Sequence, residues 1–327
     1  MTTGALATKR LEDIGFYTLT DERARISNSR SSLWRCELLI TDKCNFACPY
    51  CRGISRNARV PYAAAKWVID FWLSERLQNV RFSGGEPTLV PWLPDLIERA
   101  ASGGARAAVS TNGSASRKCY EDLLKAGATD FSVSLDACCA ETADRMSGRS
   151  GILDHVQESI EFLSSRTYVS VGVVLTQANL SSAKQIVEFA HGLGVADIRI
   201  IPSAQYGPKI GEFQVSGKII DAHPILAYRL ARIRNGLPAR GISPEDSGTC
   251  RLALDDMAVL GGDHYPCIIA LREGAEPIGP IWRDVRGARG EWVAITDTHK
   301  NRICQENCLD VCVAYNNRAR ELRGNSK

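Results

Sequence analysis

The chain has 327 residues, with 40 Lys and Arg against 37 Asp and Glu and a net charge of +3. This length is enough for one large domain with a smaller appendage, and 44% hydrophobic and 24% charged residues are typical of a globular protein. The small net charge argues against a nucleic-acid partner, and apolar runs such as Val169–Leu175 are too short to cross a membrane.

The chain contains 12 Cys, and its first residues lack the apolar segment of a signal peptide. We therefore predict a cytoplasmic protein. Because the cytoplasm is reducing, these cysteines are not expected to form a disulfide framework. Clustered cysteines in such a protein indicate metal binding or catalysis.

Strand and helix patterns alternate through the first two thirds of the chain. Residues 1–33 are polar and predict a partly ordered N-terminal extension. Over residues 34–205, short apolar segments favour strands buried on both faces of a parallel sheet, with right-handed crossovers. Six strands are two fewer than a complete eight-fold barrel has, so we predict an α/β fold with a partial (β/α)6, TIM-like barrel. The predicted strands are Arg35–Asp42, Asn79–Gly84, Arg106–Asn112, Asp130–Asp136, Tyr168–Leu175 and Asp197–Pro202. The predicted helices between them are Ala63–Leu77, Leu93–Ala101, Lys118–Ala126, Ile152–Ser164 and Ala183–Leu193.

The chain changes character near Gln205. A turn-rich loop is predicted at Gln205–Pro224, followed by a helix at Pro224–Asn235. Residues Gly236–Lys327 then predict an irregular segment that holds five of the 12 Cys, and such a segment is typically organised by metal. We assign residues 206–327 to a Cys-rich C-terminal cap.

Three cysteines follow the first predicted strand in the sequence LLITDKCNFACPYCRG. Cys44, Cys48 and Cys51 have the spacing C-x3-C-x2-C, which lets one short loop present three thiolates to one cluster. Thiolates favour iron–sulfur clusters or zinc, and a structural zinc site needs a fourth ligand that is missing locally. The loop lies at the C-terminal end of the strand, where barrels place their chemistry.

This loop, with Tyr50 as the aromatic residue before its last Cys, resembles the signature of the radical S-adenosylmethionine (SAM) enzymes. The resemblance implies a [4Fe–4S] cluster held by Cys44, Cys48 and Cys51, with one iron open to the amino and carboxylate groups of SAM. It also implies that one-electron reduction cleaves SAM to a 5′-deoxyadenosyl radical.

A second motif, Gly84-Gly85-Glu86-Pro87, follows the second predicted strand. Paired glycines permit the close approach of a ligand to the backbone, and a neighbouring carboxylate can pair with an ammonium group. Placed after the Cys loop, this sequence resembles the GGEP motif of the same family, which receives the amino group of SAM.

Polar residues at the ends of later strands complete the predicted SAM site. The resemblance implies contacts with the SAM carboxylate or ribose, or with substrate, from such positions. Ser, Thr, Asn and Asp are also favoured there by turn chemistry alone, and that alternative stays open. The predicted SAM-binding residues are Tyr50, Gly84, Gly85, Glu86, Asn112, Ser134, Asp136, Arg145, Arg149 and Thr176.

The C-terminal cysteines form a third motif. Cys250 and Cys267 are spaced C-x11-G-x4-C, and Cys304, Cys308 and Cys312 follow as C-x3-C-x3-C. This pattern resembles the auxiliary-cluster extension called SPASM, or its shorter form, twitch. A full SPASM domain has seven Cys for two clusters, so five favour one auxiliary [4Fe–4S] cluster. The downstream spacing departs from the usual SPASM pattern, and a helical triplet would place its three thiols on one face.

Five cysteines for four cluster positions leave one spare thiol. We predict Cys250, Cys267, Cys304 and Cys308 as ligands, with Cys312 as the spare or as a replacement ligand. A spare thiol that returns a hydrogen atom to a substrate radical would make the protein an epimerase. If the spare is inert, the cluster is free to accept an electron, which indicates a dehydrogenase or bond-forming enzyme.

The sequence leaves three functional hypotheses. The first is a radical SAM enzyme acting on a small polar natural product, with an external one-electron donor such as flavodoxin or ferredoxin. The 43 residues before Cys44 show no winged-helix pattern of a leader-peptide domain, which favours this hypothesis. The second is a maturase of a ribosomally made peptide, and the third is a non-catalytic, zinc-stapled binding module. The substrate is predicted to lie between the barrel mouth and the cap, under the Gln205–Pro224 loop.

Overall fold

The computed structural model describes residues 10–52, 60–203 and 213–324. The chain divides into two compact units. Unit 1 comprises residues 1–39, 54–80 and 238–327, and unit 2 comprises residues 40–53 and 81–237. The predicted boundary at residues 205/206 lies outside the described residues, and the boundary at 33/34 stays a prediction.

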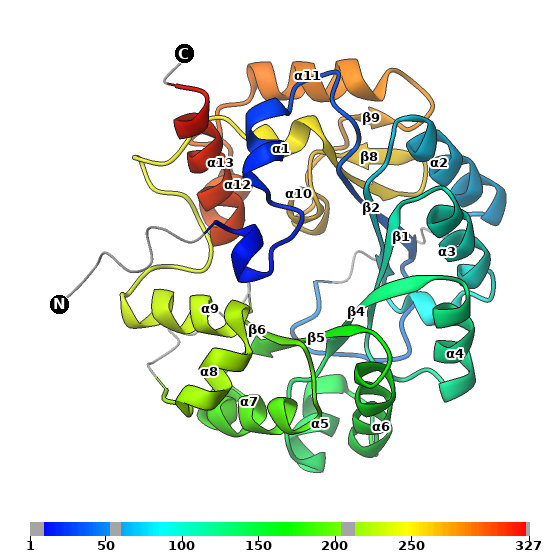
Figure 1. The fold of residues 1–327 in the computed structure, drawn as a ribbon, viewed down its shortest axis with the longest axis vertical. Coiled ribbons are helices and arrows are strands. Elements are labelled where there is room, and N and C mark those ends of the chain that lie inside the picture. The colour runs from blue at the N-terminus through cyan, green and yellow to red at the C-terminus, as the bar shows by residue number, and fades with distance from the viewer. Residues whose placement is uncertain (1–9, 53–59, 204–212, 325–327) are drawn as a thin grey trace. The chain divides into compact units, whose positions relative to one another are not determined.

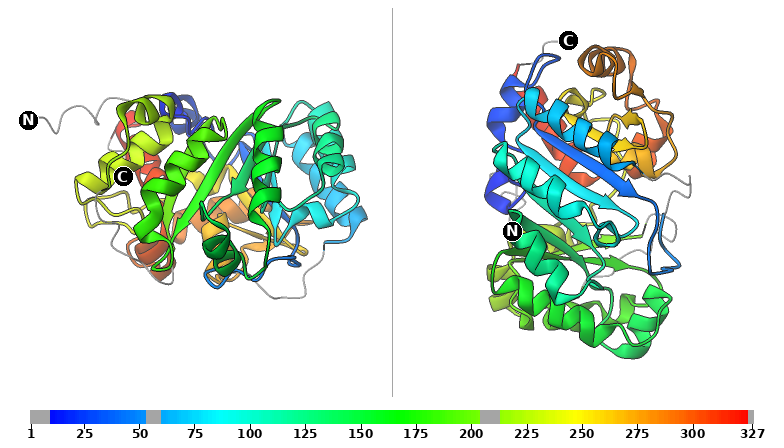
Figure 2. Two further views of the ribbon diagram at one scale, coloured as in Figure 1. Left: turned by 90° about the horizontal axis from the view of Figure 1, so that it is seen from below. Right: turned by 90° about the vertical axis from the view of Figure 1, so that its right-hand side faces the viewer.

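One sheet of nine strands has the order β6-β5-β4-β3-β2-β1-β7-β8-β9. In unit 2 the strands β3 to β6 pair in parallel in chain order, as the partial barrel predicts. Figures 1 and 2 show the helices of this unit packed along one side of its strands. The α/β fold with a parallel-rich sheet is therefore confirmed. The first six strands are β1 (Arg35–Thr41), β2 (Asn79–Gly84), β3 (Arg106–Thr111), β4 (Ala128–Ser134), β5 (Tyr168–Leu175) and β6 (Asp197–Pro202).

The helices of unit 2 form where the sequence places apolar residues at helical spacing. Most predicted bounds hold within one or two residues, but α5 was not predicted, and β4 ends at Ser134, two residues earlier than expected. Part of the predicted Gln205–Pro224 loop, up to residue 212, lies outside the described residues. The loop prediction is wrong for residues 217–222, which form α8. The helices are α3 (Leu93–Ser102), α4 (Arg117–Lys125), α5 (Ala140–Ser147), α6 (Leu153–Ser164), α7 (Ala183–Gly192), α8 (Gly217–Ala222) and α9 (Pro224–Arg234).

The two faces of the unit 2 sheet differ in chemistry. Alternate residues such as Phe131 and Val133 are fully buried and apolar, as expected under packed helices. The opposite face is polar: Ser110 pairs in register with Ser132, and both are half-buried. The expectation of strands buried on both faces is therefore wrong for this face. Its polar residues are suited to a polar ligand.

Unit 1 contains ordered structure where the sequence predicted an irregular Gly236–Lys327 segment. That prediction is wrong because several short elements bury their apolar residues together; all five residues of β7, for example, are buried. Strand β7 pairs in parallel with β1, and β8 and β9 follow it in antiparallel pairing. The strands are β7 (Asp256–Leu260), β8 (Asp263–Tyr265) and β9 (Gly279–Pro280). The helices are α1 (Asp21–Ile26), α2 (Tyr62–Ser74), α10 (Ile268–Arg272), α11 (Val285–Ile295), α12 (Arg302–Asn307) and α13 (Asp310–Leu322).

The N-terminal segment is more ordered than its polar composition predicted. Helix α1 begins after Thr20, whose hydroxyl accepts a hydrogen bond from the Arg23 N–H at 3.0 Å. The helix packs against α13, and Ala24 and Leu33 are buried. Residues 10–33 of the predicted extension are thus folded within unit 1, where buried ion pairs compensate their charged residues.

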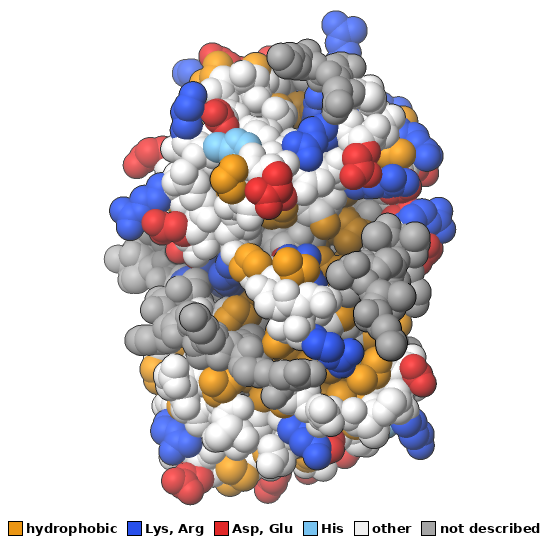
Figure 3. Space-filling view, turned by 90° about the vertical axis from the view of Figure 1, so that its left-hand side faces the viewer, with side chains coloured by type: hydrophobic (Ala, Val, Ile, Leu, Met, Phe, Trp, Pro, Cys, Tyr) orange, Lys and Arg blue, Asp and Glu red, His pale blue; other side chains and the backbone are white. Residues whose placement is uncertain are grey.

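The surface agrees with the modest net charge. On the described part of the face in Figure 3, positive and negative side chains are interspersed, and neither sign gathers into one patch. In the part of the chain that the structure describes, no helix has the length and apolar character needed to span a membrane.

Candidate functional site

The three predicted cluster ligands of unit 2 lie in one loop, residues 42–52, directly after β1. Cys44 and Cys51 are exposed and Cys48 is half-buried. Burial raises the pKa of the Cys48 thiol to about 11, and nearby negative charge, including that of Cys51 and Cys44, raises it further. The three thiols therefore influence one another's titration. Their shared loop fits a metal group that replaces the three protons and neutralises the thiolates.

The Gly84-Gly85-Glu86 turn holds the start of this loop through the backbone. The Gly85 N–H donates to the Thr41 carbonyl oxygen at 2.7 Å, and the Glu86 N–H donates to the Lys43 carbonyl oxygen at 2.8 Å. A Cβ on Gly84 would lie 2.1 Å from the Thr41 oxygen, and one on Gly85 would lie 2.2 Å from the Lys43 oxygen. These glycines are thus required because another part of the chain approaches them closely. The sequence had predicted the close approach of a ligand instead.

The Glu86 carboxylate is fully buried and bonded within unit 2. Its Oε1 accepts hydrogen bonds from the hydroxyls of Thr88 at 2.6 Å and Thr111 at 2.8 Å, and Oε2 accepts from the Asn112 N–H at 2.6 Å. Burial raises the pKa of Glu86, while these donors oppose the rise. Glu86 therefore ties the ends of β2 and β3 together, and its predicted contact with SAM stays a prediction.

The middle of the Cys loop is held by amide side chains. Asn112 Nδ2 donates to Asn45 Oδ1 at 2.8 Å and lies 3.7 Å from Cys44 Sγ. Asn45 Nδ2 in turn donates to Ser114 Oγ at 2.8 Å, and an Arg149 guanidinium nitrogen lies 3.5 Å from the Asn45 carbonyl oxygen. Asn112 and Arg149, both predicted from sequence, thus contact the loop itself.

The end of α5 supports the same loop. The Ala47 N–H donates to the Ser147 carbonyl oxygen at 2.8 Å. Gly148, at a φ of 65°, ends α5, and a Cβ there would lie 2.6 Å from the Ala47 oxygen. Asn45, Ser147 and Gly148 were not predicted as site residues from the sequence. The Ser-Gly-Arg-Ser-Gly run at residues 147–151 was the available signal for a tight helix end.

Tyr50 and Asp136 are brought together as a hydrogen-bonded pair. The Tyr50 hydroxyl donates to Asp136 Oδ2, and the Val174 N–H donates to Asp136 Oδ1 at 2.6 Å. Burial raises the pKa of Asp136 to about 6, against the lowering effect of these two donors. The aromatic residue of the Cys motif is therefore fixed to the end of the parallel sheet.

The remaining predicted residues differ in their availability to a ligand. Ser134 is exposed at the end of β4. Arg145 is exposed on α5 and lies near Thr142 Oγ1, at 3.2 Å. Thr176 is buried, and its N–H donates to Asn179 Oδ1 at 2.8 Å, which is turn chemistry. Ser134 and Arg145 are thus exposed to a ligand, whereas Thr176 is not.

Five thiols from separate elements gather in unit 1, and all are half-buried. Cys250 precedes a short 3-10 helix, Cys267 caps α10, Cys304 lies in α12 and Cys308 at its end, and Cys312 lies in α13. The triplet is not one continuous helix, because the chain leaves helical geometry at Cys308 and Leu309, so the condition for three thiols on one helix face is not met.

These five thiols nevertheless influence one another. Burial raises the pKa values of Cys267, Cys304 and Cys312 each to about 12, and further contributions come from neighbouring Cys. The pKa of Cys308 is raised by burial and then by the charges of all four other cysteines. This convergence of soft donors fits an iron–sulfur cluster.

The first two thiols of this group are faced by N–H donors. Asn316 Nδ2 donates to Cys250 Sγ at 3.7 Å, and the Ala270 N–H donates to Cys267 Sγ at 3.3 Å. Such donors stabilise sulfur in its thiolate form. They support the prediction that Cys250 and Cys267 are ligands.

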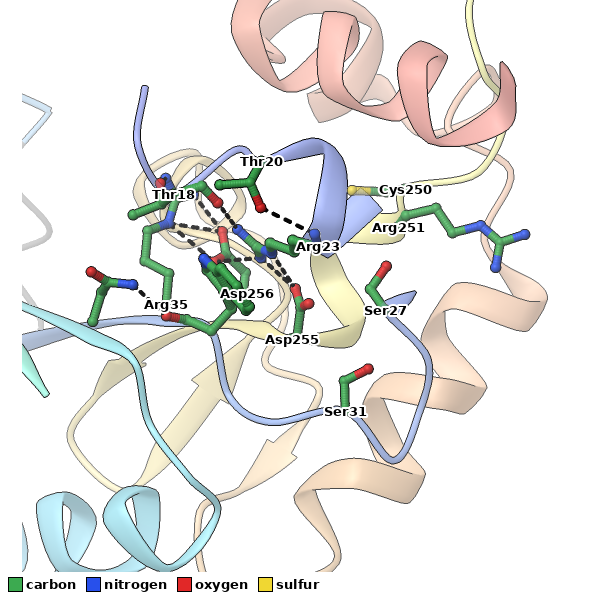
Figure 4. Close-up of polar contacts among 12 residues, drawn as sticks. Thr18, Thr20, Arg23, Ser27, Ser31, Arg35, Cys250, Arg251, Asp255 and Asp256 are labelled. Carbon is green, nitrogen blue, oxygen red and sulfur yellow. Dashed lines mark hydrogen bonds and ion pairs between the residues drawn. The ribbon is translucent and has the colours of Figure 1, made fainter. Parts of the chain in front are cut away.

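A buried ion-pair cluster lies beside Cys250 (Figure 4). Arg23 reaches from α1 and donates to Asp255, and it lies 3.1 Å from Asp256. Asp256 also pairs with Arg35, whose positive charge lowers the pKa of Cys312 against the effect of burial. Sequence reasoning missed this cluster, since nothing in the local pattern links Arg23 to residues more than 200 positions away.

Among residues 10–52, 60–203 and 213–324, no three His, Cys, Asp or Glu side chains are close enough together to hold one metal ion. In a [4Fe–4S] cluster each thiolate binds a different iron, so its ligands stand farther apart than those of one zinc ion.

The chain is similar to known proteins in sequence and in structure. Residues 38–190 match the family described as "Radical SAM superfamily". GTP 3',8-cyclase 1 of Pseudomonas aeruginosa is 28% identical over 62% of this chain and 66% of its own length. The AdoMet-dependent heme synthase of Oleidesulfovibrio alaskensis is 29% identical over 76% of this chain and 70% of its own length.

Two solved structures share the fold at low sequence identity. Streptococcus suis SuiB has a TM-score of 0.59 at 15% identity, covering 80% of this chain and 66% of SuiB. A histidine-tagged form of anSMEcpe with bound AdoMet has a TM-score of 0.58 at 14% identity, covering 88% of this chain and 96% of that chain. A match over 88% of this chain is longer than residues 1–237, so the likeness in fold extends into the Cys-rich region.

Proposed function

We propose that the chain is a radical SAM enzyme, on the match of residues 38–190 to that superfamily, and that it reductively cleaves SAM and abstracts a hydrogen atom from a small polar substrate. The family uses a [4Fe–4S] cluster and SAM, which are the cofactors predicted from the sequence. The observation that carries the proposal is the loop of Cys44, Cys48 and Cys51, held at the strand ends by backbone contacts from the GGE turn.

The residues of unit 2 take distinct roles in this proposal. Cys44, Cys48 and Cys51 bind the cluster, whose chemistry when bound is the reductive cleavage of SAM. The Gly84-Gly85 backbone and Asn112 fix the loop, and Ser134 is available to the SAM ribose or carboxylate. The remaining predicted SAM contacts are Tyr50, Glu86, Asp136, Arg145, Arg149 and Thr176.

A small polar substrate is supported by two observations. The sheet face opposite the helices carries Ser110, Ser132 and Ser170 in register on three neighbouring strands, with Arg81 donating to Ser110 and Arg199 to Ser170. Polar groups of this kind orient a polar ligand. The sequence relatives at 28–29% identity bear the names of a GTP cyclase and a heme synthase, whose named substrate or product is not a peptide. The position of the substrate under residues 205–224 stays a prediction.

A peptide substrate is the second candidate. SuiB has been solved with its precursor peptide SuiA, and anSMEcpe with the peptides Cp18Cys and Kp18Cys. These proteins share the fold with the chain at 14–15% identity. Turnover of a peptide alone, with no turnover of polar metabolites, would favour this candidate.

We also propose that four of the five C-terminal thiols hold an auxiliary [4Fe–4S] cluster. Cys250, Cys267, Cys304 and Cys308 are the preferred ligands, and Cys312 is the spare or a replacement. A reactive spare thiol leads to epimerisation, and an inert one to dehydrogenation or bond formation. A zinc-stapled, non-catalytic module would leave the SAM-cleavage motif of unit 2 without a role.

An external one-electron donor, such as flavodoxin or ferredoxin, and a cytoplasmic location complete the proposal. Radical SAM chemistry consumes one electron for each SAM that is cleaved. The exposed Cys44 and Cys51 keep the predicted cluster loop accessible from outside unit 2.

The proposal is tested by SAM cleavage with a chemical reductant under anaerobic conditions. Wild-type protein should form 5′-deoxyadenosine, and Cys48→Ala should form none because one of three cluster ligands is lost. Cys119→Ala, a half-buried thiol on α4 outside the loop, is the matched control and should retain cleavage. Retention of cleavage by Cys48→Ala would overturn the assignment.

A further inference from the structure

Helix α13 carries two neighbouring asparagines with different partners. Asn316 is 6% exposed and lies between Arg251 and Cys250. Asn317 instead accepts a hydrogen bond from the Ser247 N–H at 2.8 Å and donates to Asp246 Oδ1 at 2.7 Å. Among the hydrogen bonds of the described residues, Asn316 has one to a clustered thiol, that of Cys250, and Asn317 has none.

The orientation of the Asn316 amide follows from its partners. The Arg251 backbone N–H points to Asn316 Oδ1 at 2.8 Å. Because a backbone N–H can only donate, the atom that faces it must be the amide oxygen. The NH₂ group is therefore directed at Cys250 Sγ, 3.7 Å away. This fixed amide has no freedom to present its oxygen to the sulfur.

Hydrogen bonds to sulfur affect the redox chemistry of a cluster. Reduction adds one negative charge, which is shared by the iron, the sulfide and the thiolate ligands. An N–H donor at a ligand sulfur therefore stabilises the reduced state more than the oxidised state and raises the reduction potential. The buried carboxylates Asp255 and Asp256 do not oppose this locally, since each is paired with an arginine.

We propose that Asn316 is a positioning residue that donates a hydrogen bond to the Cys250 thiolate and raises the reduction potential of the auxiliary cluster. The proposal rests on the proposed function, which places a cluster at Cys250. It assigns a redox role to a side chain that is not itself a ligand.

The test isolates the auxiliary cluster in the full-length chain. Cys44, Cys48 and Cys51 are all changed to Ala, so that about four iron atoms from one [4Fe–4S] cluster remain. The midpoint potential is then measured by dye-mediated titration with electron paramagnetic resonance detection. Asn316→Asp keeps an oxygen for the Arg251 N–H but removes the donor to sulfur. Asn317→Asp adds the same charge one position along the helix and is the matched control.

The expected result is a more negative midpoint for Asn316→Asp than for Asn317→Asp. A tenfold fall in the ratio of reduced to oxidised cluster at a given potential corresponds to about 59 mV for one electron. Equal midpoints in the two variants, with iron retained, would overturn the inference and leave the auxiliary cluster in place. A wild-type chain that binds only the loop cluster would instead overturn the auxiliary-cluster proposal, and this inference with it.

A second pair of variants is used if Asn316→Asp fails to retain iron. Asn316→Ala and Asn317→Ala remove one amide each without adding charge. The midpoint should fall in the first and stay near the parent value in the second. A parent-like midpoint in Asn316→Ala would contradict the role of the donor, because a purely structural amide has no effect on the potential of a cluster that still assembles.

Discussion

The two groups of thiols differ in how the chain assembles them. In unit 2, Cys44, Cys48 and Cys51 share one short loop, and neighbouring backbone groups hold it. In unit 1, thiols from Cys250 to Cys312 come from separate short elements that converge only in the folded state. The first arrangement depends on close backbone packing at a few glycines. The second depends on buried polar contacts between distant segments.

The largest effect is expected on stability, from loss of the buried ion pairs of unit 1. Arg23→Ala should lower the free energy of unfolding by about 3–5 kcal/mol, because it leaves Asp255 buried without its main cation. Urea denaturation measures the change. Arg25→Ala, on the exposed side of the same helix, should stay within about 0.5 kcal/mol of wild type. Equal stability of the two variants would show that the Arg23 cluster does not support the fold.

The Cys loop of unit 2 should lose its geometry when one close backbone contact is disturbed. Gly85→Ala places a Cβ against the Lys43 carbonyl oxygen and displaces the chain that leads into Cys44. A misplacement of about 1 Å near reacting groups costs about 100-fold, so SAM cleavage should fall by at least about that factor. Gly192→Ala, where nothing lies within 4 Å of the added Cβ, should cleave SAM normally. Similar rates for the two variants would contradict the account of the GGE turn.

A smaller, pH-dependent effect is expected in unit 1. Burial lowers the pKa of His264 from 6.5 to about 4, with a further lowering from Arg289. The unfolded chain therefore binds a proton near pH 6.5 that the folded chain does not bind until about pH 4. Stability is lost as pH falls through this window, by about 2 kcal/mol between pH 7 and pH 5.

His264→Gln removes this titration, so its loss of stability between pH 7 and pH 5 should be smaller than that of wild type by the same amount. His155→Gln, on α6 of unit 2, is the control. Urea unfolding at the two pH values measures the difference. If His264→Gln loses as much stability as wild type, the buried neutral histidine is not the source of the pH dependence.

The sequence predicted most where the pattern is local. The strand ranges Asn79–Gly84, Tyr168–Leu175 and Asp197–Pro202 are those of the structure, because apolar segments bounded by turn residues define buried strands. The Cys loop was located by spacing alone. The reason for Gly84-Gly85 was not predicted, since only coordinates show that these glycines face Thr41 and Lys43.

The sequence predicted least where distant segments meet. Arg23 contacts Asp255, and Asn316 contacts Cys250, across separations that periodicity does not report. The short strands of Gly236–Lys327 also fall below the length at which alternation is recognisable. The polar composition of residues 1–33 predicted a partly ordered extension, because sequence alone does not show that Asp21 and Arg23 pair with distant residues.

The central claim is that each group of thiols holds its own [4Fe–4S] cluster. Iron and labile sulfide per chain after anaerobic reconstitution test it most directly. The account predicts about eight iron for wild type and about four when Cys44, Cys48 and Cys51 are changed to Ala. It predicts about four again when Cys250, Cys267, Cys304, Cys308 and Cys312 are changed to Ala, because the loop cluster remains. About four iron in wild type and none after the loop substitutions would contradict it.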